Sequence, residues 1–264
     1  MSLEGQPIDV SIVIPAYNEA QRLPPFLDQL VASCAASRLV YEIIVVDDGS
    51  RDDTARLVAS AVARTTNLTL LQLPRNRGKG SAIKRGLLAS RGAIALFLDA
   101  DGSVAPDEIE QHLPWLQERG YDVVIGSRAL RGPGQRLSVR AHRKWLGELF
   151  NLVARTLLLP GIRDTQCGLK YFRRDVIAPV FSLARVPGFG ADLEILYLAR
   201  RLGYRIKEIP ISWHHVSRSK VRLLADSLSM LANLIQIRWW HRRVSRPRPA
   251  PDQPQACRDF VRPS

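Results

Sequence analysis

The chain has few cysteines and no long run of apolar residues. Its three cysteines, Cys34, Cys167 and Cys257, are scattered, without the spacing of a zinc site or a disulfide framework, which fits a reducing cytoplasm. The longest uncharged stretch near the C-terminus, Ser227–Ile237, is shorter than the ~18–20 residues of a membrane-spanning helix. The apolar run Val10–Ile14 lacks the basic flank and cleavage site of a signal peptide.

Acidic residues are scarce too, and whole segments have none. The net charge is +13, from 38 Lys and Arg against 25 Asp and Glu. Residues 75–91 and 127–147 each hold six basic residues and no acid, and residues 238–264 hold seven arginines against two aspartates. Such clustering predicts an anionic partner: a nucleic acid, a phosphorylated substrate or an acidic membrane surface. A basic face that is merely solvated is the alternative.

Apolar, β-branched runs alternate with helical patterns through the first half of the chain. Strands are expected at 10–14, 42–46, 68–73, 93–98 and 122–125, and helices at 25–33, 54–63, 81–89 and 106–119. This alternation predicts an α/β fold with a parallel sheet, helices on both faces, and ligands beyond the carboxyl ends of the strands.

The pattern changes after residue 128. We expect a loop at 128–138, a helix at 139–159, a short element near 166–172, a helix at 191–201, a strand at 205–214 and a last helix at 223–243. The last helix is apolar except for one narrow polar stripe, and it ends in Arg-Trp-Trp-His-Arg-Arg. Aromatic residues beside cations are typical of a membrane interface. A core helix that ends in a solvated basic turn fits equally well.

These patterns predict three parts. Residues 1–220 form the main domain, with one half at about 8–128 and the other at about 129–220. Residues 221–243 form an apolar helix at a membrane surface or a protein interface. Residues 244–264, rich in proline and arginine, are expected to be disordered.

Polar residues follow the predicted strands directly. Asp99 and Asp101 come after the strand at 93–98, and their spacing turns both side chains to the same side. Two carboxylates suit Mg²⁺ or Mn²⁺, which keeps other positions for water and phosphate oxygens. Asp-x-Asp-Gly is also an ordinary turn sequence. Four more polar segments, 15–19, 47–50, 75–80 and 126–128, also follow strands, and five such ends at one edge of a sheet favour a site.

With these motifs placed, the chain resembles the inverting glycosyltransferases of family 2. That resemblance implies the GT-A fold, a mixed, Rossmann-like sheet that binds nucleotide sugars. It also implies that residues 1–220 are the catalytic domain, with the nucleotide sugar bound by the half at about 8–128 and the acceptor by the half at about 129–220. Asp-Asp-Gly-Ser at 47–50 and Asp-x-Asp at 99–101 are typical of the whole family. Gly-Ile-Arg-Asp-Thr-Gln-Cys-Gly-Leu-Lys at 161–170, Ala-Asp-Leu-Glu-Ile-Leu-Tyr at 191–197 and Ser-Lys at 219–220 resemble the polyprenyl-phosphate glycosyltransferases, above all the dolichyl-phosphate β-glucosyltransferases.

The resemblance implies a role for each matching residue. The pocket for the nucleotide base and ribose would be lined by Pro15, Tyr17, Glu19 and Asp47. Asp48 would also belong to the nucleotide-binding residues, and Lys79 would approach the nucleotide. A carboxylate such as Asp47 can accept the imide N–H of uracil, which favours UDP. The divalent ion on the diphosphate would be held by Asp99 and Asp101, while a third protein ligand stays open.

The acceptor side follows from the same resemblance. Donor or acceptor phosphates would be neutralised by Arg128 together with either Arg140 or Arg143, and by the pair Ser219 and Lys220. Gln166 would lie near the sugar or the acceptor phosphate. Asp192 and Glu194 fall where many family members keep a general base. An acceptor phosphate is already an anion and needs no strong base, whereas an alcohol would need one such as Asp192.

The favoured function is transfer of a hexose, glucose from UDP-glucose, to a polyprenyl or dolichyl phosphate. Because the chain begins almost directly at its first strand, we expect peripheral rather than permanent attachment to the cytoplasmic face of a membrane. One alternative is the same fold using GDP-mannose or a hydroxyl acceptor; another is an inactive fold used for assembly. A nucleic-acid-binding protein is disfavoured, because the chain lacks a recognition motif and carries carboxylates among its basic clusters.

Overall fold

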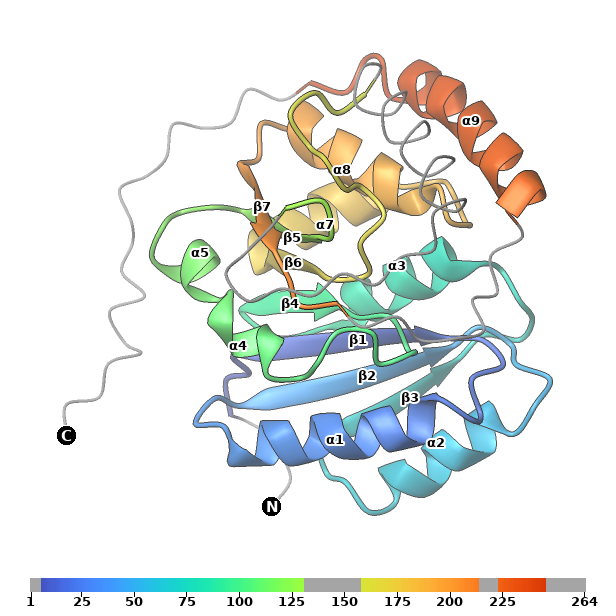
Figure 1. Ribbon diagram of the computed structural model, residues 1–264, viewed down its shortest axis with the longest axis vertical. Helices are drawn as coiled ribbons and strands as arrows, with labels where there is room; N and C mark the ends of the chain where they lie inside the picture. The colour runs from blue at the N-terminus through green and yellow to red at the C-terminus, as the bar shows by residue number, and fades with distance from the viewer. Residues whose placement is uncertain (1–5, 131–157, 214–222, 246–264) are drawn as a thin grey trace.

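The computed structural model describes residues 6–130, 158–213 and 223–245, and for residues 223–231 it describes the backbone alone (Figure 1). Several predictions lie outside this part of the chain: Arg140, Arg143, Ser219, Lys220, most of the helix at 139–159 and nearly all of the C-terminal tail. They stay predictions.

A seven-stranded sheet forms the centre of the molecule, in the order β3-β2-β1-β4-β6-β5-β7. Its strands are β1 Val10–Ala16, β2 Tyr41–Asp47, β3 Leu68–Gln72, β4 Ile94–Phe97, β5 Val123–Ser127, β6 Lys170–Arg173 and β7 Ile206–Pro210. β6 runs antiparallel to both of its neighbours, and the remaining pairs are parallel. The sheet is therefore mixed, which confirms the mixed sheet that the resemblance implied; the parallel sheet expected from the alternation alone was wrong at β6.

Helices cover both faces of the sheet, as predicted (Figure 1). The helices are α1 Leu23–Ala36, α2 Thr54–Val62, α3 Lys79–Ala89, α4 Glu108–Gln111, α5 Pro114–Gln117, α7 Arg174–Leu183, α8 Ala191–Arg201 and α9 Leu223–Trp240. One apolar core lies between the sheet and α3, α7 and α8, and the other lies between the sheet and α1, α4 and α5. The inner strands β1, β2, β4, β5 and β6 are almost wholly buried, which is typical of a sheet covered on two sides, whereas the edge strands β3 and β7 are partly exposed.

Proline accounts for two differences from the predicted elements. The helix expected at 106–119 is two short helices, because Pro114 has no N–H to continue α4 and instead begins α5. Helix α7 was not predicted at all, since Pro179 inside it reads as a helix breaker. The strand expected to reach residue 214 ends at Pro210, although Trp213 still forms an isolated bridge with Val104.

None of the helices in the described ranges is both long and apolar enough to cross a bilayer.

Candidate active site

The loop between β1 and α1 is fixed from within by Glu19. Its carboxylate accepts hydrogen bonds from the Arg22 guanidinium at 2.6 and 2.7 Å, and its backbone N–H donates to Thr54 Oγ1 at 2.7 Å. Pro15 and Tyr17 lie half-buried in the same segment. A cleft of about 510 Å³ adjoins this loop, lined by residues 18–22 and 51–53. We call the edge formed by the loops that follow the carboxyl ends of the strands the rim. Glu19 therefore shapes one wall of the rim.

Asp47 and Asp48 end β2 and hold the next loops in place. Both oxygens of the buried Asp47 lie 3.3 Å from the backbone N of Ser50. Asp48 accepts from the backbone N–H of Arg77 at 2.8 Å and of Gly78 at 2.7 Å. Burial raises the pKa of Asp48 although these two donors oppose the shift. Asp48 thus holds the loop that leads into α3 and Lys79.

Asp99 and Asp101 follow β4, and Asp99 is already partnered. Its Oδ1 lies 2.8 Å from the Lys79 ammonium. The backbone of Gly168 lies directly against the Asp99 carboxylate, so that a Cβ at this glycine would clash with it. Asp101 Oδ1 accepts from the Ser103 backbone N–H at 3.0 Å. Arg22 is a cation that sequence reasoning missed: Glu19 chiefly raises its pKa, and Asp101 and Asp99 add to the effect.

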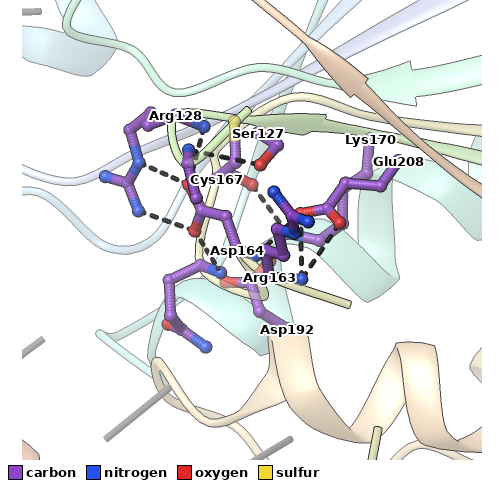
Figure 2. Close-up of polar contacts among 10 residues, drawn as sticks. Ser127, Arg128, Arg163, Asp164, Cys167, Lys170, Asp192 and Glu208 are labelled. Atoms are coloured by element: carbon purple, nitrogen blue, oxygen red, sulfur yellow. Dashed lines mark hydrogen bonds and ion pairs between the residues drawn. The ribbon is translucent and has the colours of Figure 1, made fainter. Parts of the chain in front are cut away.

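A buried ion pair between Lys170 and Asp192 joins the neighbourhood of Asp99 to α8. Lys170 is fully buried and its ammonium lies 2.5 Å from Asp192 Oδ1 and 2.6 Å from the Cys167 carbonyl oxygen (Figure 2). The second oxygen of Asp192 lies 3.7 Å from Lys79. The register that pairs Phe97 with Lys170 brings this lysine beside the end of β4. Two lysines and two aspartates therefore alternate across the rim.

The charges in this cluster stabilise one another. Burial alone would raise the pKa of Asp99, but Lys79, with Lys170 and Arg128, outweighs it and holds that pKa below its ordinary value. Burial alone would lower the pKa of Lys79, but Asp99 and Asp192 raise it. Both groups are therefore ionised near neutral pH.

Arg128, at the end of β5, is held by Asp164. The Asp164 carboxylate accepts from Arg128 Nε at 2.7 Å, Nη2 at 2.9 Å and the backbone N–H at 3.0 Å (Figure 2). Burial would raise the pKa of Asp164, yet Arg128 keeps it below its ordinary value. A fork of this kind fixes the plane of the guanidinium. Arg128 is thus pre-oriented at the rim.

Glu208 on β7 supports the loop that carries Asp164. Its carboxylate accepts from the backbone N–H of Arg163 at 3.0 and 3.1 Å and of Asp164 at 2.7 Å (Figure 2). Sequence reasoning missed Glu208 altogether, since one glutamate on a strand carries no signal. It also gave no role to Asp164 or Lys170, although both lie in the 161–170 motif.

Gln166 and Glu194 have contrasting environments. Gln166 Nε2 is the one buried side-chain nitrogen or oxygen among the described residues without a hydrogen-bond partner. Glu194, two residues after Asp192 on α8, is fully buried and its carboxylate accepts from the backbone N–H of Arg185 and Val186 at 2.8 and 2.7 Å. Its other oxygen lies 2.7 Å from His241 Nε2. Glu194 therefore ties α8 to its neighbours and is separated from the rim that Asp192 faces.

The oxygen donors at the rim fit a hard divalent cation. Asp99 and Asp101 supply carboxylates two residues apart, and the described residues contain no cluster of three acidic, His or Cys ligands. Mg²⁺ and Mn²⁺ commonly take one or two carboxylates and complete their shell with phosphate oxygens and water. This donor set suits an ion that arrives with a diphosphate.

Comparison with known proteins agrees with this geometry. Residues 11–181 match the family model "Glycosyl transferase family 2". The chain is 36% identical to dolichyl-phosphate beta-glucosyltransferase of Dictyostelium discoideum, over 88% of this chain and 76% of that protein. It is 35% identical to the Saccharomyces cerevisiae enzyme of the same name, over 89% and 75%.

Solved structures share the fold. Glucosyl-3-phosphoglycerate synthase of Mycobacterium tuberculosis, crystallised with Mn²⁺, UDP and glucosyl-3-phosphoglycerate, aligns with a TM-score of 0.66 at 23% identity, over 89% of this chain and 81% of that one. Mannosyl-3-phosphoglycerate synthase of Rubrobacter xylanophilus aligns with a TM-score of 0.70 at 20% identity, over 91% and 77%. These likenesses confirm the predicted GT-A fold. The chain is a glycosyltransferase that belongs to glycosyl transferase family 2 and, within it, to the dolichyl-phosphate β-glucosyltransferases.

Proposed function

We propose that this protein transfers glucose from UDP-glucose to a polyprenyl phosphate of the dolichyl phosphate type, with inversion at the anomeric carbon. The names of its relatives support the sugar and the acceptor. A structural neighbour crystallised with Mn²⁺, UDP-glucose and phosphoglyceric acid supports the donor. In this reaction an acceptor phosphate oxygen bonds to the anomeric carbon as the bond to UDP breaks, and UDP leaves.

The burial of Asp192 and its pairing with two lysines are the observation that carries the proposal. Its oxygens lie 2.5 Å from Lys170 and 3.7 Å from Lys79, and the residue is 1% exposed. A hydroxyl acceptor would have to surrender a proton to a nearby base, and the carboxylate predicted for that task is engaged with two ammonium groups. A phosphate acceptor is already an anion and surrenders none. The arrangement supports a phosphate acceptor.

The cations of the rim would stabilise the anions that the reaction brings together. Arg128 presents a guanidinium whose orientation Asp164 fixes, and Lys79 lies between Asp99 and Asp192. Preorganised charges of this kind stabilise developing negative charge at small reorganisation cost. Gln166 offers an unpartnered buried N–H₂ group. This group can donate a hydrogen bond to an oxygen of the sugar or of the acceptor phosphate.

Asp99 and Asp101 would hold Mg²⁺ or Mn²⁺, which when bound supplies positive charge to the departing diphosphate. The base and ribose would lie toward Pro15, Tyr17, Glu19 and Asp47, beside the cleft of about 510 Å³. Since polyprenyl phosphates reside in bilayers, the reaction would take place with the protein bound peripherally at the cytoplasmic face of a membrane.

The test is a transfer assay with purified protein, radiolabelled UDP-glucose, Mn²⁺ or Mg²⁺, and a short polyprenyl phosphate in detergent. We expect a lipid-linked glucose product that disappears when a chelator is added. The variant Asp101→Asn should stay folded and lose the metal-dependent transfer, whereas Asp107→Asn, on the exposed start of α4, should keep it.

Parallel reactions separate the alternatives. Polyprenol replaces polyprenyl phosphate, 3-phosphoglycerate replaces the lipid, and GDP-mannose replaces UDP-glucose. Efficient transfer to polyprenol or 3-phosphoglycerate would overturn the phosphate acceptor, and a preference for GDP-mannose would overturn the donor.

A further inference from the structure

The last turns of α9 expose two large apolar side chains. Ile235 is 72% exposed and Trp239 is 62% exposed, and their spacing of four residues puts them on the same side of the helix. Elsewhere in the described chain, the exposed large apolar residues are Leu88 at 43% and Leu183 at 37%. The most exposed apolar side chains of the described molecule are therefore neighbours on one helix.

The opposite side of the same turns is firmly packed. Leu234 and Ile237 are buried in the core beside α8. His241 is 2% exposed and lies 2.7 Å from Glu194, while Arg201 donates to the carbonyl oxygens of Arg242 and Val244 at 3.0 and 2.8 Å. These contacts fix the rotation of the helix, so Ile235 and Trp239 cannot turn inward without breaking them.

The exposed side is also cationic. Arg238 and Arg242 are exposed beside the two apolar residues, and the Arg242 guanidinium lies 5.1 Å from the centre of the Trp239 ring. No Asp or Glu occurs between residues 232 and 245. We call Ile235, Arg238 and Trp239, together with Arg242 in the turn that follows the helix, the outer face of α9. The positive charge of this face is complementary to an anionic surface, and its two apolar side chains suit the boundary between lipid headgroups and acyl chains.

The outer face is connected to the active site through α8. Asn233, on the preceding turn of α9, packs against Gly190, where an added Cβ would lie 2.5 Å from its amide nitrogen. Gly190 precedes Asp192 by two residues, and Asp192 belongs to the charge cluster of the rim. Figure 1 shows α9 at the periphery of the molecule, and α9 contacts α8. A surface bound at the outer face would thus be separated by α9 from the helix that carries an active-site carboxylate.

We propose that the outer face of α9 is the surface through which the protein binds an anionic lipid bilayer. This inference rests on the proposed function, because a polyprenyl phosphate acceptor must be reached at a bilayer. Trp239 and Ile235 insert at the interface, and Arg238 and Arg242 bind lipid phosphates. A second copy of the chain would bring the same arginines against one another, which the charge of the face disfavours.

The test is co-sedimentation of the full chain with vesicles of phosphatidylcholine, with and without phosphatidylserine. Parental protein should bind the anionic vesicles. Replacing both residues, Ile235→Ser with Trp239→Ser, should weaken that binding about tenfold or more, since each side chain loses interfacial burial. The matched control is Leu88→Ser, an exposed leucine on α3 that should leave binding unchanged. Arg238→Gln with Arg242→Gln should reduce binding to anionic vesicles and its dependence on salt.

Unchanged vesicle binding in the Ile235/Trp239 double variant would overturn the inference. So would a parental dimer, measured by light scattering, that the same variant converts to monomer, because the face would then bind a second copy. Transfer to a short polyprenyl phosphate in detergent separates this inference from the proposed function. A double variant that loses vesicle binding and keeps this transfer supports both. Loss of vesicle binding in a protein that transfers nothing supports the surface and contradicts the function.

Discussion

At the scale of single residues, Gly168 sets the position of Asp99. Any Cβ at residue 168 would overlap the Asp99 carboxylate, so Gly168→Ala must displace it. We expect the affinity for Mn²⁺, measured by titration calorimetry with UDP present, to fall on the order of tenfold, or about 1.4 kcal/mol. The control is Gly188→Ala, where nothing lies within 4 Å of the added methyl group. Equal Mn²⁺ affinities in the two variants would show that Asp99 does not hold the metal.

Glu208 acts at the same scale, through Arg128. Glu208→Gln leaves a single acceptor oxygen for the backbone N–H groups of Arg163 and Asp164, and turns an amide N–H₂ toward one of them. The loop should loosen and Arg128 lose its fixed orientation. We expect the KM for the phosphate-bearing substrates to rise several-fold, with a smaller change in kcat and in the melting temperature.

Glu118→Gln, at an exposed position after α5, is the matched control and should leave KM unchanged. A Glu208→Gln variant that loses stability while its KM stays parental would assign Glu208 to the fold alone.

Local sequence could propose functional residues that lie close together along the chain, but it could not identify the partners that hold them from across the sheet. Asp99 and Asp101 are two residues apart in the segment that follows β4, so the sequence alone is enough to propose a shared role for them. The partners of Arg128 come from residue 164, and through it from residue 208. Their proximity depends on strand β6 running antiparallel between β4 and β5, which no spacing along the chain specifies.

At the scale of elements, Glu194 joins α8 to α9 and to the loop after α7. Glu194→Gln replaces an acceptor of three partners, His241 among them, with a group that presents N–H₂ to at least one donor. A buried donor left unsatisfied costs about 1–3 kcal/mol. We therefore expect the melting temperature to fall by several degrees, roughly 2–8 °C. The transfer rate per folded molecule should stay close to parental.

Asp192→Asn is the comparison for this prediction, since Asp192 faces the rim and pairs with Lys79. It should lose transfer. If Glu194→Gln lost transfer at parental stability, Glu194 would instead be the base that its sequence position suggests.

The elements themselves were predicted well where one period dominates. The strands at 10–14, 42–46 and 68–73 and the helices at 54–63 and 191–201 agree with the structure to within a few residues. Prediction failed where proline interrupts a helix that tertiary packing restores. In α7, Val176, Ile177, Val180 and Phe181 are buried around Pro179, and their burial outweighs the local cost of the proline.

At the scale of the whole molecule, the paired charges at the rim balance one another. Lys79, Lys170 and Arg128 face Asp99, Asp192 and Asp164. The net charge of +13 is therefore carried elsewhere, and arginines such as those on the outer face of α9 contribute to it. The separation matters because charges that pair inside the protein contribute to stability, whereas the unbalanced ones attract anionic partners from solution.

This pairing predicts how the stability of the molecule depends on pH. The pKa values of Asp99 and Asp164 lie below their ordinary value of 3.8 in the folded state. Both residues thus contribute fully above that value. As the pH falls through it, the unfolded chain takes up protons before the folded one does, and the contribution is lost. We expect the free energy of unfolding, measured with urea between about pH 6 and about pH 3, to fall steeply below about pH 4.

Asp164→Asn should flatten that fall, because its side chain no longer titrates, and should lower the stability at neutral pH by leaving Arg128 unpaired. The matched control is Asp53→Asn: Asp53 also pairs with an arginine, Arg56, but both side chains are exposed, at 64% and 71%. A solvated pair contributes little, so this variant should keep the parental pH profile. An acid transition that survives unchanged in Asp164→Asn would mean that other carboxylates govern it and that the buried pairs at the rim contribute little to stability.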